Sequence, residues 1–129
     1  MQKERPLSPH LTVYKPQITS VLSILNRIFG SFMAISTPVL VCWLMAIAAG
    51  PEAYASLQAC FSHWFAKLFL LAWAFAFFFH MSNGVRHLFW DAGHGYELET
   101  LNKSGYAVLA SATILTLITV YFALNGGAS

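Results

Sequence analysis

Charged side chains are scarce in this sequence. Seven lysine and arginine residues and five aspartate and glutamate residues make up 9% of its 129 positions, whereas about a quarter of the residues in an average soluble domain are charged. The net charge of +2 supplies no basic surface of the kind that binds nucleic acid. Cysteine is also rare. Cys42 and Cys60 form no CxxC pair, and both are interpreted as packing residues in or beside apolar runs.

The beginning of the chain lacks the short apolar core of a signal peptide. Residues 1–17 contain Pro6, Pro9 and Pro16, which prevent a continuous helix, so we expect an extended N-terminal arm there. The sequence starts at a methionine without a transit segment. This favours the bacterial inner membrane over the mitochondrial inner membrane as its location.

Apolar residues are abundant, at 57% of the chain, and 16% of all residues are aromatic. A helix that crosses a bilayer needs about 20 predominantly apolar residues. The sequence therefore predicts an all-α membrane protein with a single domain over residues 1–129. Three membrane-spanning helices follow the arm, at about residues 20–49, 63–90 and 104–124.

Local breaks divide the apolar runs. Pro38 is expected to kink the first span, and Ser36 or Thr37 could bond the carbonyl group that the proline frees. Residues 52–62 are expected to form a short connection that could include a helical turn. A polar loop punctuated by Gly93 and Gly95 is expected before the third span.

The distribution of lysine and arginine predicts the orientation, because these residues concentrate on the inner side of a membrane. The side that holds the N-terminal arm and the second loop carries six of them: Lys3, Arg5, Lys15, Arg27, Arg86 and Lys103. The opposite side carries only Lys67. We therefore predict that the N-terminus lies inside and the C-terminus outside.

The second span contains ionisable side chains, which are costly in a bilayer and indicate function by default. His80, Gly84 and His87 fall on one helix face, at i, i+4 and i+7. A flat macrocycle ligated by His80 could lie against the gap at Gly84. Arg86 lies about 9 Å along the axis from His80, where the macrocycle's acidic edge could reach water. This pattern indicates a haem site, although a structural, hydrogen-bonded His80 is an equal alternative from spacing alone.

A haem at His80 would need help from another chain. His87 lies about 10.5 Å from His80 along the same helix, so the two imidazoles cannot flank one iron. The first and third spans contain no histidine. Either the iron is five-coordinate or a partner subunit supplies the sixth ligand, and three helices are also too few to enclose a haem.

Three segments carry a resemblance to a known family. RPLSPHLTVY, SILNR and HMSNGVRHLFWD resemble the cytochrome b membrane-anchor subunits of succinate dehydrogenase (respiratory complex II). The resemblance covers nearly the whole chain. It implies one of two small anchors that bind haem b and ubiquinone in the bilayer and hold an iron–sulfur subunit and a flavoprotein subunit.

The resemblance also implies site residues. His80 matches the axial ligand of the haem iron, and Arg86 and His87 match groups near the haem propionates. Ser23 and Arg27, which are neighbours at i and i+4 on the first span, match positions that line the quinone pocket. In one departure, Asn26 stands where the family usually has histidine, and an asparagine cannot be a cation.

The implied role is electron transport linked to the tricarboxylic acid cycle. Succinate is oxidised on the flavoprotein, and electrons pass through iron–sulfur clusters to a quinone. This chain is thus expected to be a subunit of an enzyme without a catalytic residue for succinate. Ser23 can donate a hydrogen bond to a quinone carbonyl, and Arg27 can stabilise negative charge that develops on it.

Two alternatives stay open. The chain could be the haem b subunit of another quinone-linked oxidoreductase, such as a fumarate reductase. It could also be a small membrane protein without a redox role, in which His80 is structural. An absorption spectrum of the purified complex distinguishes these, because only the haem-binding proteins show a reduced b-type α-band.

Overall fold

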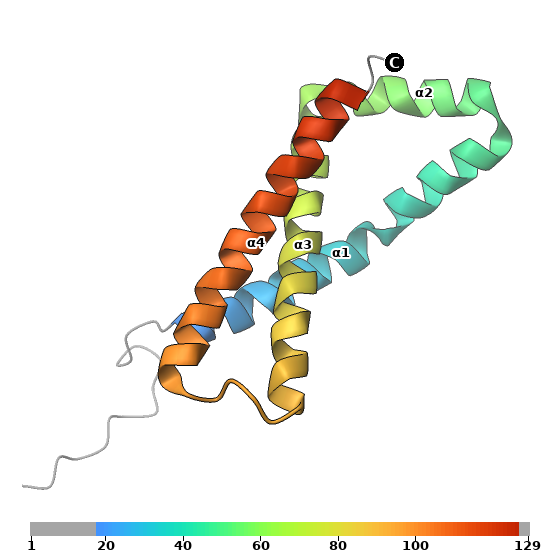
Figure 1. Ribbon diagram of the computed structural model, residues 1–129. Helices are drawn as coiled ribbons and strands as arrows, with labels where there is room; N and C mark the ends of the chain where they lie inside the picture. Colours follow the sequence, from blue (N-terminus) through green and yellow to red (C-terminus); the bar gives the residue numbers. More distant parts are fainter. Residues whose placement is uncertain (1–17, 127–129) are drawn as a thin grey trace, which may run out of the picture.

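A computed structural model describes residues 18–126, and the predicted N-terminal arm lies outside them. The described chain folds into helices alone: α1 (Ile18–Ala49), α2 (Pro51–Phe61), α3 (Trp64–Asp91) and α4 (Leu98–Asn125). Figure 1 shows α3 and α4 side by side, with α1 passing behind α3 about midway along it and α2 bridging α1 and α3 at the end opposite the α3–α4 loop. The predicted all-α fold is confirmed.

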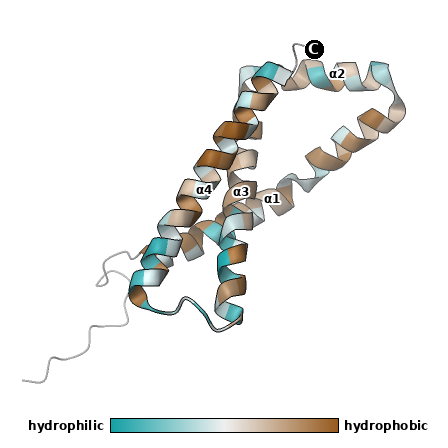
Figure 2. Cartoon of the chain, viewed as in Figure 1, coloured by the Kyte–Doolittle hydropathy of each residue, from teal (hydrophilic) through white to brown (hydrophobic). Residues whose placement is uncertain are grey.

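Three of these helices are long and apolar enough to cross a membrane: α1, α3 and α4. They contain 32, 28 and 28 residues, which is about 42–48 Å at 1.5 Å per residue. The hydrocarbon core of a bilayer is only about 30 Å thick. Figure 2 shows the hydrophilic residues of α3 and α4 gathered near the loop that joins them. The predicted number of membrane-spanning helices, three, is confirmed.

Two connections differ from the sequence prediction. Residues 52–62 do not form a simple link, because α2 is an 11-residue helix that begins at Pro51, where a missing backbone N–H costs nothing. Gly50 precedes it with φ of 116°, a conformation that favours glycine. The third span begins at Leu98, six residues earlier than Ser104. An ion pair between Glu99 and Lys103 at 2.7 Å supports this first, exposed turn.

The helix α1 continues through Pro38, and its ribbon is locally irregular about midway along (Figure 1). The proline removes the N–H that would have bonded the carbonyl of Ala34. Ser36 and Thr37 donate instead to the carbonyl oxygen of Met33, at 3.0 and 3.1 Å. The prediction that Ser36 or Thr37 donates a hydrogen bond to the carbonyl freed by Pro38 is therefore wrong. Ser36 is only two residues from Ala34 and cannot reach its carbonyl, and Thr37 donates to the carbonyl four residues before it instead of to that of Ala34.

The core lies where α1 crosses α3 and α4. We call this half of the bundle the loop end, because it includes the α3–α4 loop (residues 92–97), and the opposite half the α2 end. The buried cluster consists of Leu22, Phe79, Val108 and Ala112. A side chain at Gly105 would meet Leu22 Cδ1 at 2.8 Å, so this glycine lets α1 and α4 approach closely. Toward the α2 end, α1 diverges from α3 and α4 (Figure 1).

Candidate haem and quinone site

His80 extends from α3 toward α1, where it meets Gly30. A Cβ atom on Gly30 would lie 3.0 Å from His80 Cε1 and 3.3 Å from Nδ1. Even an alanine would crowd the imidazole, so Gly30 is the cradle in which the ring sits. Sequence reasoning missed Gly30. The available signal was a small residue in a spanning helix, which is common at helix contacts and does not identify its neighbour.

Two buried polar atoms in the described residues have no hydrogen-bond partner. They are His80 Nδ1 on α3 and Asn26 Oδ1 on α1, one helical turn before Gly30. Such atoms are rare in folded proteins, because burial without a partner costs about 1–3 kcal/mol for each group. The two atoms lie on neighbouring helices near the Gly30–His80 contact. This region is therefore the part of the described chain that most needs a further binding partner.

The face of α3 that carries His80 is open beyond it. A Cβ atom on Gly84 would meet nothing within 4 Å, and the His87 side chain is exposed. The described helices leave room beside Gly84 for a flat group that starts at His80. The predicted face of His80, Gly84 and His87 is thus present and uncovered at its second and third positions.

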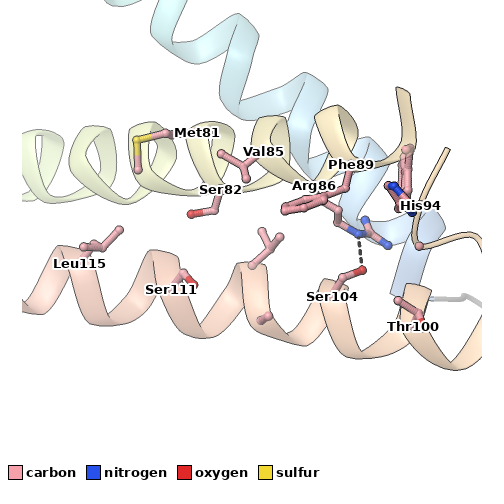
Figure 3. A pocket seen from close by; sticks show the side chains of 14 residues that line it. Met81, Ser82, Val85, Arg86, Phe89, His94, Thr100, Ser104, Ser111 and Leu115 are labelled. Carbon is pink, nitrogen blue, oxygen red and sulfur yellow. Dashed lines mark hydrogen bonds between the residues drawn. The ribbon is translucent and has the colours of Figure 1, made fainter. Parts of the chain in front are cut away.

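Arg86 lies on a different side of α3 from His80. Its Nε donates to Ser104 Oγ at 2.9 Å, and one terminal nitrogen donates to the Leu101 carbonyl at 2.9 Å. The other terminal nitrogen contacts Asn83 Oδ1 at 3.4 Å. Only 5% of Arg86 is exposed, and Figure 3 shows its side chain directed at Ser104. The guanidinium therefore clamps α3 to α4, and its placement near haem propionates stays a prediction.

Ser23 and Arg27 are both exposed on α1, beside the half-buried Asn26. Several hydroxyl groups in the spans donate to a carbonyl of their own helix, as Thr113 and Thr116 do. Ser23 forms no such bond with another described residue, and its side chain is exposed. The structure thus brings Ser23 and Arg27 to one accessible surface, and their contact with a quinone stays a prediction.

His80 lines none of the following three cavities between the described helices. A cavity of about 520 Å³ runs between α3 and α4 and is walled mainly by apolar side chains, with Arg86, Ser104 and His94 near the loop (Figure 3). Two others, of about 300 and 700 Å³, lie at the α2 end. Within the described residues, no three histidine, cysteine, aspartate or glutamate side chains gather to hold a metal ion. A haem iron bound here would need His80 together with a ligand from elsewhere.

Residues 1–119 match the family described as succinate dehydrogenase/fumarate reductase transmembrane subunit. The sequence is 41% identical over 115 residues to the succinate dehydrogenase cytochrome b556 subunit of Rickettsia conorii, covering 89% of this chain and 90% of the relative. It is 35% identical over 116 residues to the cytochrome b556 subunit of Paracoccus denitrificans, covering 90% and 89%. It is 39% identical over 133 residues to the cytochrome b560 subunit of Marchantia polymorpha, covering 93% and 91%. The bacterial relatives and the three apolar helices fit a multi-pass protein of the bacterial inner membrane.

Proposed function

The chain belongs to the succinate dehydrogenase/fumarate reductase transmembrane subunit family, and from this premise we propose that it is the haem b- and ubiquinone-binding anchor of a succinate dehydrogenase. A second small anchor subunit, an iron–sulfur subunit and a flavoprotein subunit complete the complex. The relatives named above are succinate dehydrogenase subunits. Their names favour this role over fumarate reduction or a membrane role without redox chemistry.

In this proposal His80 holds the haem iron. Its buried, unpartnered Nδ1, the cradle at Gly30 and the open space beside Gly84 all fit a flat group bound against α3. When bound, haem b supplies a one-electron centre whose potential depends on its ligands, hydrogen bonds and burial. The second anchor subunit would supply a further ligand to a bound haem and the rest of its enclosure, because α1, α3 and α4 leave this face uncovered.

His87 is on the same face of α3 as His80 and would hold the acidic edge of a bound haem. Arg86 is assigned to the same region by resemblance. Its guanidinium is already bonded to Ser104 and Leu101. Arg86 would therefore affect the propionates through its positive electrostatic potential and not through a direct hydrogen bond. Asn26 can offer its amide to a bound group but adds no charge where relatives usually have histidine.

Ser23 and Arg27 bind the quinone headgroup. The Ser23 hydroxyl donates a hydrogen bond to one quinone carbonyl, and Arg27 stabilises the negative charge that develops as electrons arrive. Both side chains are exposed on α1 near the loop end, which we assign to the inner side of the membrane. The iron–sulfur subunit docks on that side, so the quinone is within its reach. No residue of this chain touches succinate.

The observation that carries the proposal is the half-buried His80, whose Nδ1 is buried against the cradle at Gly30 without a hydrogen-bond partner in the described residues. The test is to purify the complex through a tag on this chain. We expect the flavoprotein and iron–sulfur subunits to co-purify with succinate:ubiquinone reductase activity and a reduced b-type α-band. Expressed without its partners, the chain should show no stable six-coordinate haem spectrum. A complete and active complex without haem would contradict the assignment of His80.

A further inference from the structure

Trp90 lies between two functionally different side chains at the loop end of α3. The Arg86 guanidinium carbon is 4.3 Å from the centre of the indole ring. The His87 ring centre is 4.7 Å from that of Trp90, with the two planes at 85°. These contacts join residues at i, i+4 and at i, i+3, which are neighbours on a helix surface. One indole therefore contacts both a buried cation and an exposed imidazole.

The indole of Trp90 is held by contacts with Arg86 and with the α3–α4 loop. Arg86 is anchored to α4 through Ser104 and Leu101, so the cation beneath the ring cannot shift without breaking these bonds. The α3–α4 loop also contacts the ring, because a Cβ atom on Gly95 would be 3.6 Å from Trp90 Cδ1. Tyr96 donates its hydroxyl to the Trp90 carbonyl at 2.5 Å. The loop and α4 together define the position of this tryptophan.

His87 has no comparable support of its own. Its side chain is exposed, and it forms no hydrogen bond with another described residue. An exposed side chain samples several staggered rotamers, and the edge-to-face contact with Trp90 favours the rotamers that keep the rings together. The orientation of His87 therefore depends on the ring of Trp90 more than on any other described side chain.

We propose that Trp90 is a positioning residue, which holds the His87 imidazole on the face of α3 shared with His80 and Gly84. Through Trp90, the clamp between Arg86 and α4 sets the direction of His87. This inference rests on the proposed function, in which His87 lies at the acidic edge of the haem. A donor held there stabilises the reduced form, which carries one more negative charge, and so raises the haem midpoint potential.

The experiment uses the complete complex and four variants: Trp90→Leu, Trp90→Phe, His87→Leu and the double variant Trp90→Leu/His87→Leu. We expect Trp90→Leu to lower the haem midpoint potential in the same direction as His87→Leu. The double variant should have the potential of His87→Leu alone, because Trp90 acts through His87. Trp90→Phe should keep the wild-type potential, since an aromatic face remains beside both partners.

A second measurement reports on His87 directly. Modification of His87 by diethyl pyrocarbonate, followed by peptide mass spectrometry, should become severalfold faster in Trp90→Leu and stay unchanged in Trp90→Phe. Trp64→Leu is the matched control, because Trp64 also belongs to α3 but lies at the α2 end and is 72% exposed. It should change neither quantity. If Trp90→Leu does not assemble, Trp90→Met retains bulk without a ring and provides the same comparison.

Two outcomes would overturn the inference. The first is an unchanged potential and an unchanged His87 modification rate in Trp90→Leu, which would make Trp90 an interfacial anchor only. The second is an additive decrease in the double variant, which would show that the two residues act independently. A wild-type complex without haem would contradict the proposed function instead. The modification rate of His87 would then decide the positioning role alone.

Discussion

The loop end and the α2 end of the bundle are built differently. At the loop end, α1, α3 and α4 converge on Leu22, Phe79, Val108 and Ala112, and Arg86 is satisfied by α4. At the α2 end, α1 diverges (Figure 1). One polar bond there joins α1 to α3, from Trp73 Nε1 to Ser36 Oγ at 2.8 Å, beside cavities of about 300 and 700 Å³.

This contrast shows that the helices are held together by contacts within the chain at the loop end, whereas the α2 end has fewer such contacts. In a bilayer, helices associate through packing and hydrogen bonds, because lipid removes the hydrophobic drive between them. The chain concentrates both kinds of contact at the loop end. The residues proposed to bind haem and quinone extend from this packed half to the middle of the spans. Changes at the loop end should therefore affect function most, and matched changes at the α2 end should affect it least.

The largest expected effect is that of His80→Ala. Removing the imidazole removes the proposed iron ligand, so the b-type absorption spectrum of the purified complex should disappear or convert to another form. His63→Ala, which changes a histidine beside α2, should leave the spectrum intact. An unchanged spectrum in His80→Ala would place the haem elsewhere.

Arg27→Leu should come next. Hydrogen bonds and contacts to charged groups contribute about 1.5–3 kcal/mol, so quinone reductase activity should fall by roughly tenfold to a hundredfold. Succinate oxidation measured with an artificial acceptor at the flavin should be retained. Lys67→Leu, at the α2 end, is the control and should keep quinone turnover. Normal turnover in an assembled Arg27→Leu complex would exclude the proposed quinone position.

Ser23→Ala should have a smaller effect on the same reaction. Loss of one hydrogen bond to a neutral carbonyl costs about 0.5–1.5 kcal/mol, which is roughly twofold to tenfold in rate. The steady-state rate with quinone measures it, and Ser20→Ala, one turn earlier on α1, is a matched control. Equal effects of the two substitutions would argue against a specific bond from Ser23.

Arg86→Gln tests the clamp at the loop end. It removes donors to Ser104 and Leu101, which should destabilise the complex by about 1–3 kcal/mol and lower its thermal unfolding temperature. Lys103→Gln changes a cation in the same region, but its pair with Glu99 is 75–78% exposed, so little change is expected. Equal unfolding temperatures for both variants would show that the buried bonds contribute nothing.

The smallest expected effect belongs to the α2 end. Trp73→Phe removes the bond to Ser36 but keeps an aromatic ring against Phe77, with which Trp73 stacks at 5.6 Å. Hydrogen bonds between membrane helices contribute about 0.6 kcal/mol on average. The unfolding temperature should fall only slightly, and the haem spectrum should not change. A large loss of assembled complex in Trp73→Phe would contradict the conclusion that the α2 end contributes less to stability than the loop end.

The membrane spans could be predicted from sequence because the physics that produces them is local. Any backbone in lipid must satisfy its own hydrogen bonds, so a long apolar run without charges is sufficient to predict a helix. The shared face of His80 and Gly84 could also be predicted from local sequence, since helical periodicity alone places residues four apart on one side of a helix. The helix α2 was missed because its sequence is short and only moderately apolar.

Contacts between distant helices were beyond such reasoning. The cradle for His80 is Gly30, fifty residues earlier in the chain, and the partner of Arg86 is Ser104 on α4. Neither pairing follows from a period or a motif, because it depends on how two helices rotate about their axes. The sequence placed Arg86 beside the predicted haem, whereas the structure shows its guanidinium bonded to α4.

The close approach of α1 to Gly105 has a consequence for the order in which the helices assemble. The loop between α3 and α4 is short, spanning residues 92–97, so these two helices can close as a hairpin as soon as both are inserted. Pairing of α3 with α4 would place Arg86 against α4. It would also leave the surface at Gly105, against which Leu22 and Ile18 of α1 pack, ready for α1. We expect α1, although synthesised first, to dock last, and substitutions at Gly105 to trap a hairpin with an undocked first helix.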